Sequence, residues 1–268
     1  MTPPRPVMDS RVRARRIAVT RQVGRRRLKL VLGGLGAAAL VAAAVALTRS
    51  PLLDVDRIEV VGARHTGRAA VVTAGRLGAS PLMVSVDTGA VAKRVETLPW
   101  VLDARAERRW PATVRVKVTE RQAVAVVAAD GGHWALVDIT GRVLALQSVR
   151  PPGLAALGGL GRPGPPGSNL GPAGRPALEV VAALAPDLAA RVVDITTVVS
   201  GAGGSADQPG IDLSLTADGG PAGVVRLGVT TALAEKLDAL RTVLEKVPLE
   251  DLAIVDLRVP RSPVLTRR

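Results

Sequence analysis

An uncharged stretch of 18 residues, Leu30 to Leu47, constrains this chain more than any other feature. As a helix it would rise about 27 Å, close to the hydrocarbon thickness of a bilayer, which is about 30 Å. Arg25, Arg26, Arg27 and Lys29 precede it, whereas only Arg49 follows closely. Because basic residues collect on the cytosolic side of a membrane, we expect a single transmembrane helix with a cytoplasmic N-terminus.

Three other interpretations of this stretch stay open. Its many Ala and Gly residues are compatible with a buried core helix. The small residues Ala44 to Ala46 resemble the cleavage site of a secretory signal, and Arg25 to Leu30 resembles a twin-arginine export signal. The 29 residues that precede the stretch are long for either signal, which favours the anchor.

The net charge of +13 is concentrated in a basic tail, because residues 1–29 carry +9 and residues 30–268 carry only +4. The only aromatic residues are Trp100, Trp110 and Trp134, so platforms for stacked bases are nearly absent. We therefore expect no nucleic-acid partner. The absence of cysteine excludes disulfides and cysteine nucleophiles, so stability must come from burial.

Residues 54–121 carry the patterns of a small α+β domain. In Thr113 to Thr119, Val114, Val116 and Val118 alternate with polar residues, as expected for a strand with one buried face. The other expected elements are a strand at Arg57 to Val61, a helix capped by Thr66 and ending at Ala74 and Gly75, a helix capped by Asp87 and ending near Leu98, and a strand that buries Leu102, Ala104 and Ala106. The resulting order is β-α-α-β-β.

Short motifs in this region resemble those of one family. They are Ile58-x-Val60-x-Gly62, Gly78-x-x-Pro81-Leu82, Val86-Asp87, Leu98-Pro99-Trp100-Val101, Arg109-Trp110-Pro111-x-Thr113-Val114 and Glu120-Arg121-x-x-Val124-Ala125. In this order they are similar to the POTRA domain of the FtsQ/DivIB bacterial cell-division proteins, and the composition resembles that of high-GC, actinobacterial members. The resemblance implies a POTRA domain at residues 54–121.

The tryptophans of this region are expected to pack rather than to bind. A domain with no other aromatic residue needs large apolar side chains, so Trp100 and Trp110 most simply lie in the core or at its rim, with a role as binding anchors as the alternative. Pro111 most simply sets the turn between two strands.

Residues 122–264 predict a second, mixed β domain. Strands are expected at Val124 to Ala129, His133 to Val137, Val143 to Leu146, Val192 to Val198, Ile211 to Thr216 and Val224 to Leu227, with a helix near Pro176 to Ala185. Residues 150–175 are rich in Pro and Gly and are expected to form a mobile surface loop. This loop contains Gly159-x-Gly161-x-x-Gly164, but a dinucleotide site is excluded because we expect no strand before it and its prolines stop a following helix.

The clearest helix is expected at Thr230 to Val247, where an apolar stripe repeats at steps of four and three. Arg241 and Glu245 are expected to pair on its outer face. The last strand is expected at Leu252 to Val259. Together with Leu227-Gly228 and Lys236-Leu237, its Ile254-Val255-Asp256-Leu257-Arg258 looks like the FtsQ β domain.

In that family this region offers its last strand and the preceding helix to FtsB-type partners bound with FtsL. A late strand often lies at a sheet edge, where a partner strand can add by backbone hydrogen bonding. The expected partner-binding residues are Ile254, Val255, Asp256, Leu257, Arg258 and Val259. Val259 stands where better-known members carry an aromatic residue.

No motif predicts catalysis, a cofactor, a metal or a small-molecule substrate. His65 and His133 have no motif partner, and Asp130 and Asp138 are better explained as turn formers. We therefore expect a non-enzymatic divisome scaffold, held in the plasma membrane by one helix with its bulk outside, that recruits FtsB- and FtsL-type proteins to septal wall synthesis. A POTRA chaperone or secretion module and an anchored cell-wall hydrolase are the alternatives.

Overall fold

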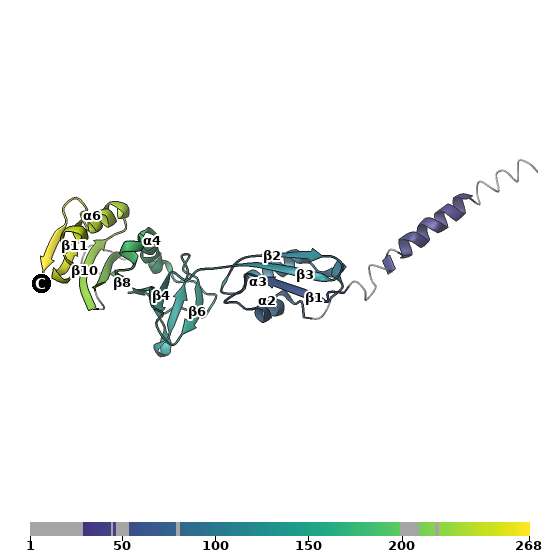
Figure 1. Cartoon of the computed structure of the whole chain (residues 1–268), viewed down its shortest axis with the longest axis horizontal. Helices are drawn as coiled ribbons and strands as arrows, with labels where there is room; N and C mark the ends of the chain where they lie inside the picture. The colour runs from purple at the N-terminus through teal and green to yellow at the C-terminus, as the bar shows by residue number, and fades with distance from the viewer. Residues whose placement is uncertain (1–28, 44, 47–53, 79–80, 199–208, 218–219) are drawn as a thin grey trace, which may run out of the picture. The chain divides into compact units, whose positions relative to one another are not determined.

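The computed structural model describes residues 29–43, 45–46, 54–78, 81–198, 209–217 and 220–268 (Figure 1). By its internal contacts the chain divides into two compact units. The smaller consists of Met1–Arg57, Ala79–Val86 and Arg108–Val114, and the larger of Ile58–Gly78, Asp87–Glu107 and Arg115–Arg268. Of the expected tail at residues 1–29, residues 1–28 lie outside the described residues.

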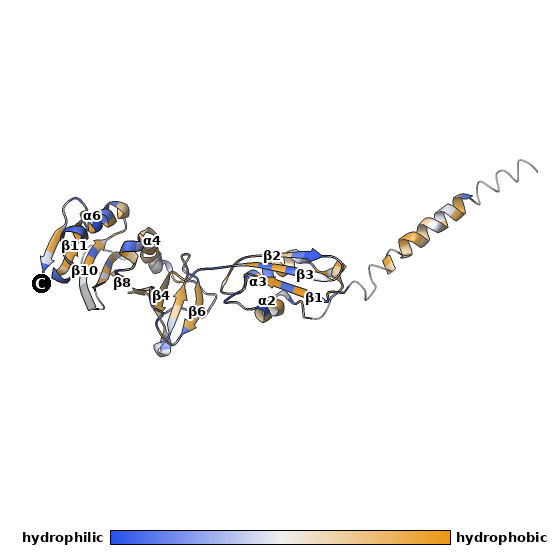
Figure 2. Cartoon of the chain, viewed as in Figure 1, coloured by the Kyte–Doolittle hydropathy of each residue, from blue (hydrophilic) through white to orange (hydrophobic). Residues whose placement is uncertain are grey.

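Residues 29–43 and 45–46 are helical. Their apolar side chains are exposed, with Leu30 at 75% and Leu40 at 74%, and Figure 2 colours this helix from white to orange beyond its N-terminal end. Positions 44 and 47 of the uncharged stretch lie outside the described residues. Across the part of the chain that the structure describes, no helix has the length and apolar character needed to cross a bilayer.

Backbone hydrogen bonds join three distant segments of the smaller unit. The amides of Asp56 and Arg57 donate to the carbonyl of Ala112, with N to O distances of 3.0 and 3.1 Å. The amide of Val55 donates to the carbonyl of Pro81 at 3.1 Å. Residues 54–57 therefore lie against the turn that contains Ala112 and against the segment that contains Pro81.

The expected β-α-α-β-β order is confirmed. Its elements are β1 (Arg57–Val61), α2 (Arg68–Gly75), α3 (Thr88–Glu96), β2 (Val101–Arg109) and β3 (Thr113–Glu120), with a short 3-10 helix at Met83–Ser85. The described strands form a sheet in the order β1-β3-β2. Val114, Val116 and Val118 of β3 are buried as predicted, together with Val91 and Val95 of α3.

Two local predictions are wrong. The residue that caps α2 is Gly67, not Thr66, and the Thr66 amide donates to the Glu120 carboxylate in the connection before the helix. In β2, Leu102 is 54% exposed whereas Val101 and Ala104 are buried. The strict alternation expected there is therefore interrupted, which an edge strand such as β2 tolerates.

Glu120 joins the end of β3 to the connection before α2. Its carboxylate accepts hydrogen bonds from the amides of His65 and Thr66, at 2.9 and 2.7 Å, and lies 3.1 Å from Nδ1 of His65. The His65 ring in turn stacks on Trp100 with 4.3 Å between ring centroids. Burial acts to raise the pKa of Glu120, but the amide hydrogen bonds outweigh it and lower that pKa to about 2.

The remaining described strands form a nine-stranded sheet in the order β12-β11-β10-β9-β8-β7-β4-β5-β6. The strands are β4 (Ala125–Ala128), β5 (Trp134–Val137), β6 (Val143–Gln147), β7 (Ala155–Gly158), β8 (Val192–Val198), β9 (Gly210–Ala217), β10 (Gly220–Gly228), β11 (Leu252–Asp256) and β12 (Val264–Arg267). The helices are α4 (Arg175–Ala183), α5 (Pro186–Ala189) and α6 (Leu233–Lys246).

One line of directly paired residues crosses all nine strands. In sheet order it runs Leu265, Val255, Val225, Leu213, Ile195, Leu157, Val127, Ala135, Leu146. The seven inner residues are buried, and the two end residues, Leu265 and Leu146, are 37% and 45% exposed. Directly paired residues share a face, so this line marks the core face of the sheet.

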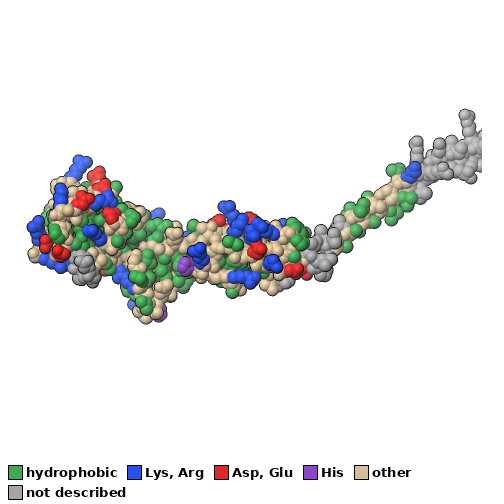
Figure 3. All heavy atoms as spheres, viewed as in Figure 1, with side chains coloured by type: hydrophobic (Ala, Val, Ile, Leu, Met, Phe, Trp, Pro, Cys, Tyr) green, Lys and Arg blue, Asp and Glu red, His purple; other side chains and the backbone are tan. Residues whose placement is uncertain are grey.

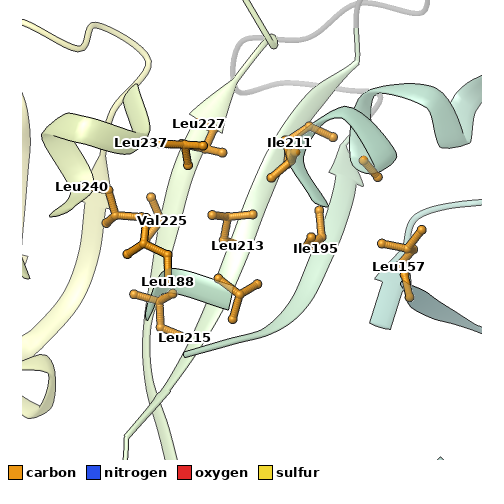
Figure 4. Close-up of a cluster of buried hydrophobic side chains, with 14 of the residues drawn as sticks. Leu157, Leu188, Ile195, Ile211, Leu213, Leu215, Val225, Leu227, Leu237 and Leu240 are labelled. Carbon is orange, nitrogen blue, oxygen red and sulfur yellow. The ribbon is translucent and has the colours of Figure 1, made fainter. Parts of the chain in front are cut away.

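Helix α6 packs on this core. Figure 4 shows Leu157, Ile195, Leu213 and Val225 following one another across neighbouring strands, and Leu237 of α6 near this apolar cluster. The helix lies within the predicted range Thr230 to Val247. The predicted pair of Arg241 with Glu245 is wrong, because the Arg241 guanidinium pairs with Asp187 at 3.3 Å and with Asp238 at 3.4 Å.

The expected loop at residues 150–175 contains a strand of the sheet interior. β7 pairs in parallel with both β4 and β8, so the prediction of a continuous loop is wrong. Three residues, Ala155 to Leu157, are too short a signal to stand out among flanking Pro and Gly. A strand thus does precede Gly159, contrary to the first reason given against a dinucleotide site. The second reason, the lack of a helix directly after the glycines, holds because no helix begins until residue 172.

The half-buried Glu120 carboxylate predicts a specific acid sensitivity. Its folded pKa of about 2 lies below the usual 4.5, so its stabilisation is complete above pH 4.5 and is lost as pH falls toward 2. We expect Glu120→Gln to lower the free energy of unfolding at pH 7 by about 2 kcal/mol and to reduce the change of that free energy between pH 4.5 and pH 2. Urea unfolding at a series of pH values measures both effects.

Glu107→Gln, which alters a half-exposed carboxylate, is the matched control and should change the free energy of unfolding by under about 0.5 kcal/mol. Equal effects of the two variants would contradict this account.

Candidate partner-binding edge

The six predicted partner-binding residues lie on β11 and on the connection that follows it. Val255 and Leu257 are buried at 1% and 0% exposure and belong to the core. Ile254 and Asp256 are half-buried, and Arg258 and Val259 are exposed. Four of the six are therefore at least partly exposed, and two are turned into the core.

The premise that this strand forms the sheet edge is wrong. β11 pairs in parallel with β10 and antiparallel with β12, in which Asp256 faces Val264 and Val255 faces Leu265. β12 is the terminal strand of the described sheet. The sequence signal for β12 is weak, because Val264-Leu265-Thr266-Arg267 is short and ends in basic residues, although Pro260 and Pro263 mark a turn before it.

Every residue of β12 is exposed, including Val264 at 63% and Leu265 at 37%. Leu265 lies on the core face, at the end of the line of paired apolar residues, and Val264 lies on the opposite face. A further strand placed beside β12 would continue the core line and cover Leu265. The outer edge of β12 therefore has the geometry needed to pair with an added strand.

An ion pair fixes the turn that leads from β11 to β12. The Arg258 guanidinium lies 2.6 Å from an Asp256 carboxylate oxygen, and the Arg258 amide donates to the same carboxylate at 3.1 Å. The hydrogen bond from Arg258 is the main cause that lowers the pKa of Asp256, and it raises the pKa of Arg258. Arg258 is thus a positioned charge beside the edge.

Asp256 also belongs to a row of charges on the face opposite the core. In the strand register, Asp212 of β9 lies opposite Arg226 of β10, and Arg226 lies opposite Asp256 of β11. Burial raises the pKa of Asp212, which Arg226 partly offsets and the nearby Asp256 reinforces. Figure 3 shows acidic and basic side chains intermixed over this end of the larger unit. Negative and positive side chains therefore alternate along this row, so it does not create a strong electrostatic potential of one sign.

Gly228 and Lys236 hold the end of β10 in place beside this row. Gly228 has φ +63°, and a β-carbon added to it would lie 2.9 Å from Cγ of Arg258, so glycine lets the arginine stem pass. Lys236 is 2% exposed, and its ammonium donates to the carbonyls of Leu227 and Val229 at 2.8 and 2.7 Å. Burial lowers the pKa of Lys236.

The residues considered for catalysis have structural contacts. His65 binds Glu120, and Nδ1 of His133 lies 3.1 Å from the carbonyl of Asp130. Asp138 accepts hydrogen bonds from the Thr140 amide and hydroxyl and therefore forms a turn, as predicted. Among the described residues, no group of three His, Cys, Asp or Glu side chains is placed to hold a metal ion.

Both halves of the described fold match known family models. The FtsQ-type POTRA domain matches residues 53–121, and the C-terminal part of the cell division protein FtsQ/DivIB matches residues 125–258, half of the chain. The chain belongs to the FtsQ/DivIB family. This confirms the resemblance that the motifs predicted. The second match ends at Arg258, so it includes β11 but not β12.

Curated relatives carry the same family name. The chain is 36% identical over 153 residues to cell division protein FtsQ of Mycolicibacterium smegmatis, covering 57% of this chain and 44% of that one. It is 32% identical over 197 residues to FtsQ of Mycobacteroides abscessus, covering 73% and 57%. With FtsQ of Zymomonas mobilis the identity is 35% over 91 residues, covering 34% and 28%. The chain thus spans about half the length of the mycobacterial relatives, which fit the predicted actinobacterial composition.

The contact between Gly228 and Arg258 predicts a cost for any side chain at position 228. We expect Gly228→Ala to lower the free energy of unfolding by about 1–2 kcal/mol, through its positive φ and the displaced arginine stem. The pKa of Asp256 should rise toward 3.8 as Arg258 moves away, which carboxyl-carbon NMR titration measures. Gly161→Ala is the matched control, since no atom lies within 4 Å of its added β-carbon. An unchanged Asp256 pKa in Gly228→Ala would refute the proposed coupling.

Proposed function

We propose that this chain is a non-enzymatic scaffold of the bacterial division machinery that recruits FtsB- and FtsL-type partners, and through them septal wall synthases, to the septum. Family membership supports a role in cell division. The observation that carries the recruiting role is β12, a strand at the end of the described sheet whose four residues are all exposed. Recognition by this edge requires no cofactor, nucleic acid or small-molecule substrate.

The proposed contact is strand addition to β12. Backbone groups along the outer side of an edge strand can bond to a partner strand, and side chains at alternate positions then set its specificity. Here an added strand would bury Leu265 on the core face and contact Val264 on the other. Covering these partly exposed side chains adds apolar burial to the backbone hydrogen bonds.

The predicted residues keep a role beside this edge. Arg258 and Val259 lie in the connection between β11 and β12, and Val259 is 60% exposed. A partner strand that runs along β12 would pass this connection, where an acidic side chain could meet Arg258. The buried Val255 and Leu257 would act only by holding β11 in place.

Proline substitutions test this proposal without removing the strand. Successive residues of a strand direct their amides to opposite sides, and the Arg268 amide donates to the carbonyl of Asp251, on the β11 side. Thr266→Pro, the inward variant, therefore removes an amide that faces β11, and Leu265→Pro, the outward variant, removes one that faces away from it. We expect the outward variant to keep its thermal stability and to recover at least tenfold less FtsB- and FtsL-type protein in pull-downs from membranes. Gln147→Pro, at the opposite sheet edge, is the control and should recover normal amounts. Normal recovery by both β12 variants would sink the strand-addition model.

We further propose that the uncharged stretch is a single-pass anchor in the plasma membrane, with a cytoplasmic N-terminus and an extracytoplasmic bulk. The helical residues 29–43 and 45–46 and their exposed leucines support this proposal. The nine arginines of residues 1–29 support the orientation. The anchor would keep both matched domains at the site where the septal wall is built.

Alkaline extraction of membranes tests the anchor. The wild-type chain should stay in the membrane with an intact N-terminus, and Leu40→Arg should release a large fraction, because a central arginine costs about 2.5–3.5 kcal/mol on insertion. Leu40→Ile is the matched control and should behave as wild type. Release of the wild-type chain, or an N-terminus just after Ala46, would overturn the anchor.

A further inference from the structure

The turn between β2 and β3 presents an exposed indole. Trp110 is 57% exposed, so the prediction that it packs in the core or at its rim is wrong. The other two indoles are half-buried, Trp100 against His65 and Trp134 with the Arg150 guanidinium 5.4 Å from its ring centroid. Pro111, joined to Trp110 by a cis peptide bond, is exposed as well. A solvated tryptophan at a loop tip is unusual and points to a contact surface.

This turn lies where the chain enters its first domain. The carbonyl of Ala112, two residues after Trp110, accepts the amides of Asp56 and Arg57 at 3.0 and 3.1 Å. Asp54 forms a bridge with Leu82, and the neighbouring Val84 is 51% exposed. All of these residues belong to the smaller unit. Two exposed apolar side chains thus share a unit with the first described residue after the uncharged stretch.

Basic side chains accompany the indole. Arg109 precedes Trp110 and is exposed, as are Arg108 and Arg57. The Arg108 guanidinium donates to the carbonyl of Val86, which ties the turn to the segment that carries Val84. Asp54 and Asp56 are the carboxylates of the same described region, so three arginines stand against two aspartates.

Chain length limits how far this turn can lie from the end of the uncharged stretch. Seven peptide steps separate Leu47 from Asp54, and an extended chain covers at most about 3.6 Å per step, or about 25 Å in all. The headgroup layer is itself about 5–7 Å thick on each side of the hydrocarbon. If the stretch spans a membrane, the turn is confined near the lipid surface.

We propose that Trp110 and Arg109, together with Val84 of the same unit, insert into the headgroup layer of an anionic phospholipid bilayer. This inference rests on the proposed anchor. Indole rings favour the membrane interface because one part is apolar and the N–H can bond to headgroups. Arginine binds lipid phosphate through its planar guanidinium. The inserted turn would fix the orientation of the first domain at the membrane, beyond the simple tether that the helix provides.

Brominated lipids test the position of the indole. The full-length chain carrying Trp100→Phe and Trp134→Phe has Trp110 as its only tryptophan and is reconstituted into vesicles of phosphatidylcholine and phosphatidylglycerol. With bromine on the upper acyl chain, we expect at least a twofold loss of Trp110 fluorescence and a shift of its emission to shorter wavelength. The control adds Trp110→Ser and Val149→Trp, which moves the indole to a position that is 72% exposed and not held by the short connection. Its emission should be unquenched.

Flotation of the same vesicles separates the two proposals. If the chain floats with the vesicles and Trp110 is quenched no more than Val149→Trp, the anchor stands and the inserted turn is wrong. A chain that does not float overturns both. Arg109→Glu should reduce the quenching on anionic vesicles by at least half, and an equal response on vesicles of phosphatidylcholine alone would remove the role given to lipid charge.

Discussion

Burial of one face of the nine-stranded sheet is the constraint on which the fold of residues 125–268 depends. The line of paired residues from Val255 to Ala135 is fully covered, and α4, α5 and α6 contribute Leu178, Leu188 and Leu240 to the same core. With no cysteine in the chain, no disulfide can substitute for this packing. Burying one Leu side chain stabilises the fold by about 1.5–3 kcal/mol. A register shift by one residue would turn a strand's apolar side chains away from the core, so the summed burial determines the strand order and the register.

The same burial decides what the C-terminal region can offer a partner. Register places Val255 in the core and Asp256 on the opposite face, and the ion pair between Asp256 and Arg258 then fixes the turn. β12 follows as a strand that the helices do not cover, which leaves Leu265 only partly buried. The proposed recognition edge is thus a direct extension of the core. It is not a separate site added to the surface.

Local signals of the first domain were readable because they act within a few residues. The alternating valines of β3 predicted their buried face, and Asp87 predicted the start of α3 by accepting the Ala90 amide at 3.0 Å. The errors arose where a distant group takes over. The cap of α2 is Gly67, and the Thr66 amide is bound by Glu120, 54 residues away. Trp110 is exposed because nothing local fixes the direction of a turn at the far end of a hairpin.

The sequence by itself determined the family, the order of the elements in the first domain and the charge asymmetry around the uncharged stretch, since motifs, periodicity and composition are properties of neighbouring residues. Tertiary structure alone decided that Ala155–Gly158 is an interior strand, that β12 and not β11 forms the edge, and that Trp110 lies in the same unit as residues 54–57. Each of these depends on pairing between residues far apart in the chain. A short segment acquires such a partner only when the whole sheet forms, so its own sequence carries little trace of the outcome.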